Sequence, residues 1–253
     1  MTETMPDTGI EAFVPFSTVH WWTLGIIFAT CLIFPKLARG RAEMPLRRLV
    51  AAALLIHVAF KTWLWIVIME RPWNEMLPLH LCDVADVMAA ILLIRGGQFL
   101  YELVYFWGLS GTLQALLTPD IPWSFPHPTY IAFFFGHGLI IVVAVYATWG
   151  MGLRPQPMSI LRAFVCLNLY ALFVTVPNIL FDANYLYLMA KPESASLMDH
   201  FGPWPWYILV LEVLALVSFF IYYLPFAAYD RIWASGFLPG ALQKLNAPLK
   251  NRS

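Results

Sequence analysis

Cys82 and His137 are the residues of this chain whose types best suit a reaction, and both lie inside strongly apolar stretches. A histidine that takes the proton of a thiol supplies the thiolate, which is the nucleophilic form of cysteine. Three titratable side chains lie within about one helical turn of Cys82, namely His80, Asp83 and Asp86. Cys82 and His137 are therefore the candidate nucleophile and general base.

Other polar side chains fall in the apolar stretches and are expected to support this pair. An ionisable side chain inside a transmembrane helix is costly unless it is paired or wet, so such residues generally face the interior of a helix bundle. Lys61 is predicted to form a structural ion pair with Asp86 or Glu212. Asn178 is a candidate to orient His137, as an amide does in Cys-His-Asn arrangements. The predicted polar pocket consists of His80, Asp83, Asp86, Lys61, Gln114, Asn178 and Glu212.

A zinc site is the competing chemistry for the same residues. His80, His137, Asp83 and Asp86 are of types that can bind zinc with an open position for water. No HxxxH or HExxH spacing occurs among them, and we predict neither a metal nor another cofactor. The cysteines Cys31, Cys82 and Cys166 all lie in apolar spans, which argues against a disulfide framework.

The elements that must position these residues are transmembrane helices. The chain has 253 residues, of which 60% are hydrophobic and only 12% are charged, and this composition does not describe a soluble protein. A bilayer core of about 30 Å needs roughly 20 apolar residues per helix. We predict an all-α polytopic bundle of seven transmembrane helices, with spans at residues 18–37, 49–69, 78–94, 98–117, 129–149, 163–181 and 206–224.

The distribution of basic residues predicts the orientation of this bundle. Twelve of the fifteen Lys and Arg residues lie in alternate connections or in the C-terminal tail, whereas Arg71 and Lys191 lie on the opposite side and Lys61 is within a span. By the positive-inside rule the N-terminus is outside and the C-terminus is cytoplasmic. Residues 1–238 are the predicted transmembrane domain and residues 239–253 a short cytoplasmic tail. Nothing in the sequence points to a nucleic-acid partner.

Depth in the bilayer brings the candidate residues together. Cys82 follows Pro78 by four residues and His137 follows Thr129 by eight, which places them about 6 and about 12 Å below the outer surface. Five more pocket residues also fall in the outer halves of their spans, namely Asp83, Asp86, Gln114, Asn178 and Glu212. Lys61 is predicted near mid-membrane, and His57 and Glu102 are predicted in the inner halves. The sequence therefore predicts one polar pocket that opens towards the outer leaflet.

Several longer motifs resemble the YwaF-like integral membrane proteins. They lie at residues 79–82, 101–111, 113–120, 125–127, 136–138, 184–192 and 202–206, so the resemblance covers about residues 80–212. The resemblance implies seven spans. Animal relatives in this family include an acyltransferase that moves fatty acyl chains between phospholipids, in which a membrane-embedded cysteine and histidine are implicated. Cys82 and His137 look like that pair, whereas Asp83 and Asp86 depart from the apolar or small residues expected after the cysteine.

The leading hypothesis is a phospholipid acyltransferase or transacylase that acts at the outer leaflet, or a lipase if water is the acceptor. Phospholipid and lysophospholipid would be its partners and a bacterial inner membrane its location. One alternative is a transporter or flippase that uses Lys61, Asp86 and Glu212 as a coupling site. A zinc-dependent lipid hydrolase and a purely structural membrane protein are the remaining alternatives.

Overall fold

The structure is a computed structural model that describes residues 11–192 and 197–234. In these residues the regular elements are helical, and they are joined by short connections. The α-helices are α1 (Thr18–Leu37), α2 (Glu43–Trp63), α3 (Leu81–Arg95), α4 (Gln98–Trp107), α5 (Leu113–Leu117), α6 (Pro128–Trp149), α7 (Pro157–Phe181) and α8 (Trp206–Ala234). The predicted cytoplasmic tail, residues 239–253, lies outside the described residues.

Two of the helical rods contain a π-helical segment. The segment η2 (Leu64–Ile68) extends α2, and η4 (Gly108–Thr112) joins α4 to α5 into one continuous rod. Segments of this type are frequently found at functional sites. Every predicted span coincides with a helix or with such a rod. The boundaries differ most where helices continue into polar sequence, because α2 begins at Glu43 rather than Leu49 and α8 runs on to Ala234.

Among the described residues, five helical stretches are long and apolar enough to cross a membrane. They correspond to α1, α2 with its flanking segments, α6, α7 and α8. The helix α3 has 15 residues and is about 22 Å long, which is shorter than the roughly 20 residues that usually span the hydrocarbon core. The all-helical membrane bundle is thus confirmed.

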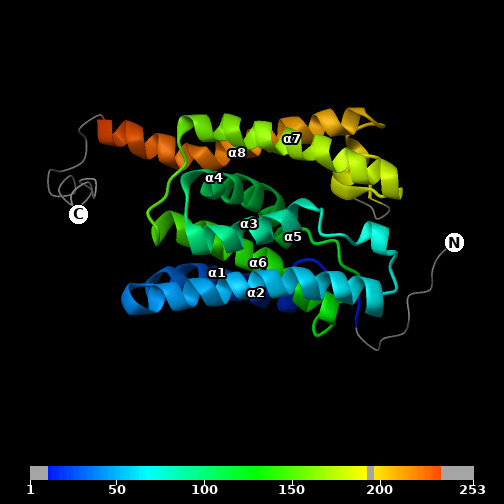
Figure 1. Cartoon of the computed structure of the whole chain (residues 1–253), viewed down its shortest axis with the longest axis horizontal. Coiled ribbons are helices and arrows are strands. Elements are labelled where there is room, and N and C mark those ends of the chain that lie inside the picture. Colours follow the sequence, from blue (N-terminus) through cyan, green and yellow to red (C-terminus); the bar gives the residue numbers. More distant parts are fainter. Residues whose placement is uncertain (1–10, 193–196, 235–253) are drawn as a thin grey trace.

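The rods pack in three layers (Figure 1). α1 and α2 form one outer layer, α7 and α8 form the other, and α3, α6 and the α4–η4–α5 rod lie between them. The main interhelical contacts join α2 to α3, α1 to α6, α3 to α4, and α4 to α7. The central layer is therefore covered on both faces, and its buried positions hold the core of the protein and its polar residues.

Local sequence sets several of the helix boundaries. Pro157 starts α7 within a capping box formed by Gln156 and Ser159. At the start of α6, the His127 ring accepts a hydrogen bond from the Thr129 backbone, and burial lowers the pKa of His127, which keeps the ring neutral and able to accept. The connection from α3 to α4 needs two glycines, Gly96 and Gly97, because both have positive φ angles.

Candidate functional site

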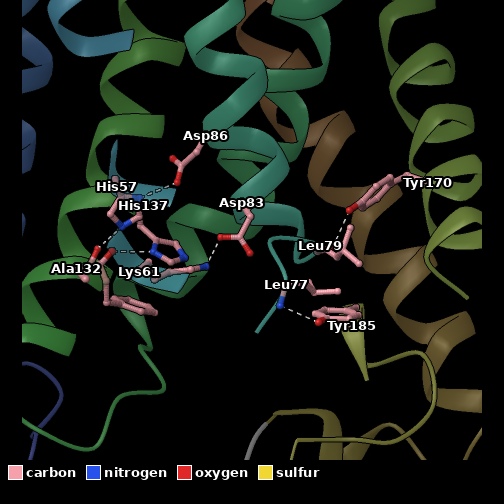
Figure 2. Close-up of polar contacts among 11 residues, drawn as sticks. His57, Lys61, Leu77, Leu79, Asp83, Asp86, Ala132, His137, Tyr170 and Tyr185 are labelled. Atoms are coloured by element: carbon pink, nitrogen blue, oxygen red, sulfur yellow. Dashed lines mark hydrogen bonds and ion pairs between the residues drawn. The ribbon is translucent and has the colours of Figure 1, made fainter. Parts of the chain in front are cut away.

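A partly buried ion pair joins the first outer layer to the central layer. The Lys61 ammonium group at the end of α2 donates to Asp83 Oδ1 near the start of α3 (Figure 2). The Asp83 side chain is only 2% exposed, so its charge depends on this lysine for compensation. The predicted partners of Lys61 were Asp86 and Glu212, and the structure corrects that prediction. Asp83 lies on the face of α3 that turns towards Lys61.

One helical turn further along α3, Asp86 forms a hydrogen bond with His57 of α2. Asp86 Oδ2 lies 2.9 Å from His57 Nδ1, and His57 Nε2 lies 2.9 Å from the Ala132 carbonyl oxygen of α6. The sequence predicted His57 in the inner half of its span and Asp86 in the outer half of its own, whereas the structure brings the two side chains into contact. His57 lies past the middle of the α2–η2 rod and reaches the same level as the polar residues of α3 (Figure 2).

The hydrogen bonds of His57 fix how many protons it shares with Asp86. A carbonyl oxygen only accepts, so His57 Nε2 must carry a hydrogen for Ala132. One further proton then lies between His57 Nδ1 and Asp86 Oδ2, either as an imidazolium–carboxylate pair or as a neutral imidazole with a carboxylic acid. The second oxygen, Asp86 Oδ1, is buried without a hydrogen-bond partner among the described residues. The pair thus stores one proton within the bundle.

The orientation of His137 leaves one of its nitrogens able to act as a base. On α6, His137 Nδ1 lies 2.8 Å from the Phe133 carbonyl oxygen, one turn earlier, and the ring stacks on the Phe133 ring with centroids 4.2 Å apart. The carbonyl accepts, so Nδ1 carries the hydrogen and the neutral ring presents a lone pair at Nε2. No hydrogen bond from another described residue engages Nε2.

Cys82 is the second residue of α3. Lys61, Asp83 and Asp86 are close enough to act on it electrostatically. Tyr170 of α7 and Tyr187 of the following connection are also within electrostatic reach of Cys82. The charges of Lys61 and Asp83 also act on His137. Cys82 and His137 therefore border the same ion pair, although no hydrogen bond joins the thiol to His137 in the described part of the chain.

Two tyrosines hold the segment that leads into Cys82. The Tyr170 hydroxyl donates to the Leu79 carbonyl oxygen at 2.8 Å, and the Tyr185 hydroxyl accepts from the Leu77 backbone nitrogen at 2.9 Å (Figure 2). The His80 ring packs edge-on against Tyr185, with centroids 5.2 Å apart. Neither tyrosine was among the predicted site residues. The signal available in the sequence was only their place in the outer half of the bundle, which many aromatic residues share.

The remaining predicted pocket residues have other partners. The buried Asn178 amide bonds the Tyr185 main chain in both directions, donating to the carbonyl oxygen at 3.0 Å and accepting from the nitrogen at 2.7 Å. Its role is therefore to hold the Tyr185 segment, and the predicted orientation of His137 by Asn178 is replaced by the Phe133 carbonyl. Glu212 accepts from Asn168 at 2.9 Å between α7 and α8, apart from Lys61.

The residues near the Lys61–Asp83 ion pair form a polar cluster, which consists of Cys82, His137, His57, Lys61, Asp83 and Asp86. Gln114 is not part of it. Gln114 lines a groove beside α8, together with Leu81 and Tyr187. Among the described residues, no group of three or more His, Cys, Asp and Glu side chains has an arrangement that could hold a metal ion. This geometry counts against the zinc-dependent alternative. The three cysteines are free, and they form no disulfide.

A family model described as the TMEM164 family matches residues 15–223, which include Cys82, His137 and the other residues of the polar cluster. No curated protein and no solved structure matches the chain. The predicted membership of a membrane-protein family is confirmed under this description rather than as YwaF-like.

Proposed function

Because the chain belongs to the TMEM164 family of membrane proteins, we propose that it acts on the lipids around it as a thiol-dependent acyltransferase. Cys82 is the nucleophile and His137 the general base in this proposal. The observation that carries it is the hydrogen bond from His137 Nδ1 to the Phe133 carbonyl oxygen. This bond leaves Nε2 free to accept a proton beside the ion pair that Cys82 also borders.

The reaction has two half-reactions. In the first, the Cys82 thiol gives its proton to His137 Nε2, and the sulfur attacks the carbonyl carbon of a phospholipid ester. A C–S bond forms, the ester C–O bond breaks, and His137 returns the proton to the departing lysolipid oxygen. In the second, the hydroxyl of another lysolipid gives its proton to His137 while its oxygen attacks the thioester. The C–S bond then breaks and the thiol is restored. Water as the acceptor gives a free fatty acid.

The Lys61 ammonium group supports this chemistry by its charge. It is close enough to act on Cys82, and a positive charge beside a thiol favours the thiolate. The same charge would stabilise the oxyanion that forms on the ester carbonyl. Asp83 holds the ammonium group in position through their ion pair. In this proposal Lys61 is the group that stabilises the oxyanion.

The proposed membrane topology follows from the distribution of the Lys and Arg residues along the chain. All seven rods cross the membrane, the N-terminus is outside and the C-terminus is cytoplasmic, in a bacterial inner membrane. The short helix α3 is surrounded by α2, α4 and α6. Because these helices separate it from lipid, α3 does not have to be as long as the hydrocarbon core is thick. The ends at which α1, α3, α6 and α8 begin form the predicted outer end of the bundle. Cys82 lies at this end and would meet lipids of the outer leaflet.

A transfer assay tests the proposal. The protein is purified, reconstituted into phosphatidylcholine vesicles with a radiolabelled acyl chain, and supplied with a lysophospholipid. Labelled diacyl product is expected from the unchanged protein and from Cys166→Ala, a matched control because Cys166 lies in α7 away from the cluster. Cys82→Ala is expected to abolish transfer. Equal transfer by Cys82→Ala and Cys166→Ala would reject the mechanism.

The His57–Asp86 pair favours one second candidate, a proton-coupled transporter. A buried pair that holds one proton, with an unpartnered carboxylate oxygen, resembles the proton relays of membrane carriers. Lipid flux across vesicles that fails in Asp86→Asn but survives in Cys82→Ala would support transport. Acyl transfer that fails in Cys82→Ala would support the enzyme.

A further inference from the structure

A long groove runs along one face of α8. Its volume is about 1060 Å³, which is just above the range of about 300–1,000 Å³ that is usual for small-molecule sites. The α8 residues that line it recur at intervals of three and four positions, so they form one continuous helix face. They are Leu211, Leu214, Ala215, Ser218, Phe219 and Tyr222. They span eleven positions, or about 16 Å along the helix axis.

The opposite wall is the α4–η4–α5 rod. Trp107, Ser110, Gly111 and Gln114 lie on it at similar helical intervals, so two helix faces run beside each other along the groove. The rods meet where the Ser218 hydroxyl donates to the Ser110 hydroxyl at 2.8 Å. This contact brings the two walls together part of the way along the groove.

The inner end of the groove is closed by aromatic residues. The Tyr105 hydroxyl donates to the Tyr222 carbonyl oxygen at 3.0 Å, and the Phe106 and Phe219 rings pack with centroids 5.1 Å apart. The other end, at the predicted outer end of the bundle, has polar side chains among its lining residues. It is lined by Thr118, Asp199 and His200. The groove therefore changes from apolar and closed to polar along its length, as a lipid chain with a head group requires.

The polar end also approaches the candidate nucleophile. Leu81, which precedes Cys82, lines the groove, and so does Tyr187. Tyr187 is within electrostatic reach of Cys82. Outside the groove, α7 and α8 turn most of their surface away from the protein, since only 11% of the apolar window of each helix is buried. In a bilayer these helices face hydrocarbon, so lipid chains are the molecules that surround the groove.

We propose that this groove binds one fatty acyl chain of a membrane lipid, with its methyl end towards Tyr222 and its ester at the polar end beside Leu81 and Tyr187. The inference deepens the proposed function and rests on it only for the reaction of the ester with Cys82. Binding of the acyl chain in the groove does not depend on a reaction at Cys82. The aromatic closure at the inner end would set the longest chain that fits.

Photocrosslinking tests the occupant directly. The full chain is placed in nanodiscs of phosphatidylcholine and phosphatidylglycerol that contain a phosphatidylcholine with a diazirine in the middle of one chain, and the labelled residues are mapped. Label is expected on the groove face of α8 and on the facing rod. Ala215→Trp, which fills the groove, should lower this label about tenfold. Val213→Trp is the matched control, because Val213 is 61% exposed on another face of α8.

A second variant fills the groove from the other wall. A Cβ added at Gly111 meets no atom within 4 Å, so Gly111→Leu fits the fold and projects into the groove. Label spread evenly around α8, or equal groove labelling in Ala215→Trp, Gly111→Leu and Val213→Trp, would overturn the inference. Groove labelling that persists in Cys82→Ala supports chain binding. If the unchanged protein is labelled in the groove but transfers no acyl chain, the proposed function fails while the binding site stands.

Discussion

The imidazole of His57 lies directly over Gly136, where α2 crosses α6. A Cβ at position 136 would meet the ring, with His57 Nδ1 and Nε2 both at 2.7 Å. Only glycine leaves room for the ring to reach Asp86 on one side and the Ala132 carbonyl on the other. Gly136 thus connects the packing of two helices to the proton that His57 and Asp86 share.

Gly136→Ala is expected to destabilise the fold. The added methyl group must displace the His57 ring, which breaks its two hydrogen bonds, and overpacking of this type costs about 1–3 kcal/mol. The measurement is the thermal unfolding midpoint in detergent micelles. Gly25→Ala is the control, because a Cβ at Gly25 meets nothing within 4 Å. Equal midpoints for the two variants would contradict the role given to Gly136.

Lys61→Met is expected to be strongly destabilising, and Asp83→Leu to rescue it. Removal of the lysine leaves the buried Asp83 carboxylate uncompensated, at a cost of about 3–5 kcal/mol, whereas an apolar pair of similar volume is often neutral. Arg71→Met is the control, because its ion pair with Glu75 is long, at 3.9 Å, and half exposed. Denaturation of the single and double variants measures the coupling. Additive effects would show that the pair does not interact.

Asn178→Ala is expected to loosen the segment that ends at Tyr185. Both main-chain groups of Tyr185 lose a buried partner, which costs about 1–3 kcal/mol. Hydrogen exchange should accelerate at the backbone amides of residues 183–188. Asn168→Ala provides the comparison, since its amide bonds only Glu212 and the preceding turn of α7. Unchanged exchange in Asn178→Ala would mean that other contacts hold this segment.

His137→Gln tests the general base in the transfer assay. Acyl transfer is expected to fall about 10²–10⁴-fold, because glutamine cannot take the thiol proton. His127→Asn should leave transfer unchanged, since asparagine can still cap α6. A His137→Gln protein that unfolds at the same temperature and transfers acyl chains at the original rate would exclude the base role.

The helices were largely predictable because span length and apolar composition determine them. The predicted span at residues 18–37 has the bounds of α1. The partners of the polar residues were not predictable, because they depend on how each helix is rotated about its axis. Asp83 and Asp86 lie three positions apart, and only packing against α2 decided that Asp83 meets Lys61 while Asp86 meets His57.

Cys82 and His137 remain the predicted pair, and the main-chain contact that orients His137 was not predictable from the sequence. Cys82 and His137 stand out because a thiol and an imidazole in lipid need an explanation. The Phe133 carbonyl that orients His137 is a main-chain group, and a main-chain partner has no sequence signal. His57 was not predicted in the pocket because its depth was counted from a span that began at Leu49, whereas the helix begins at Glu43.

The intact mass of the protein after incubation with phosphatidylcholine tests the thioester mechanism directly. A nucleophilic Cys82 is expected to give a mass increase of one acyl group that hydroxylamine removes, that maps to Cys82, and that is present in Cys166→Ala but absent in Cys82→Ala. No acyl adduct under single-turnover conditions, or an adduct that persists in Cys82→Ala, would contradict a thioester mechanism at this site.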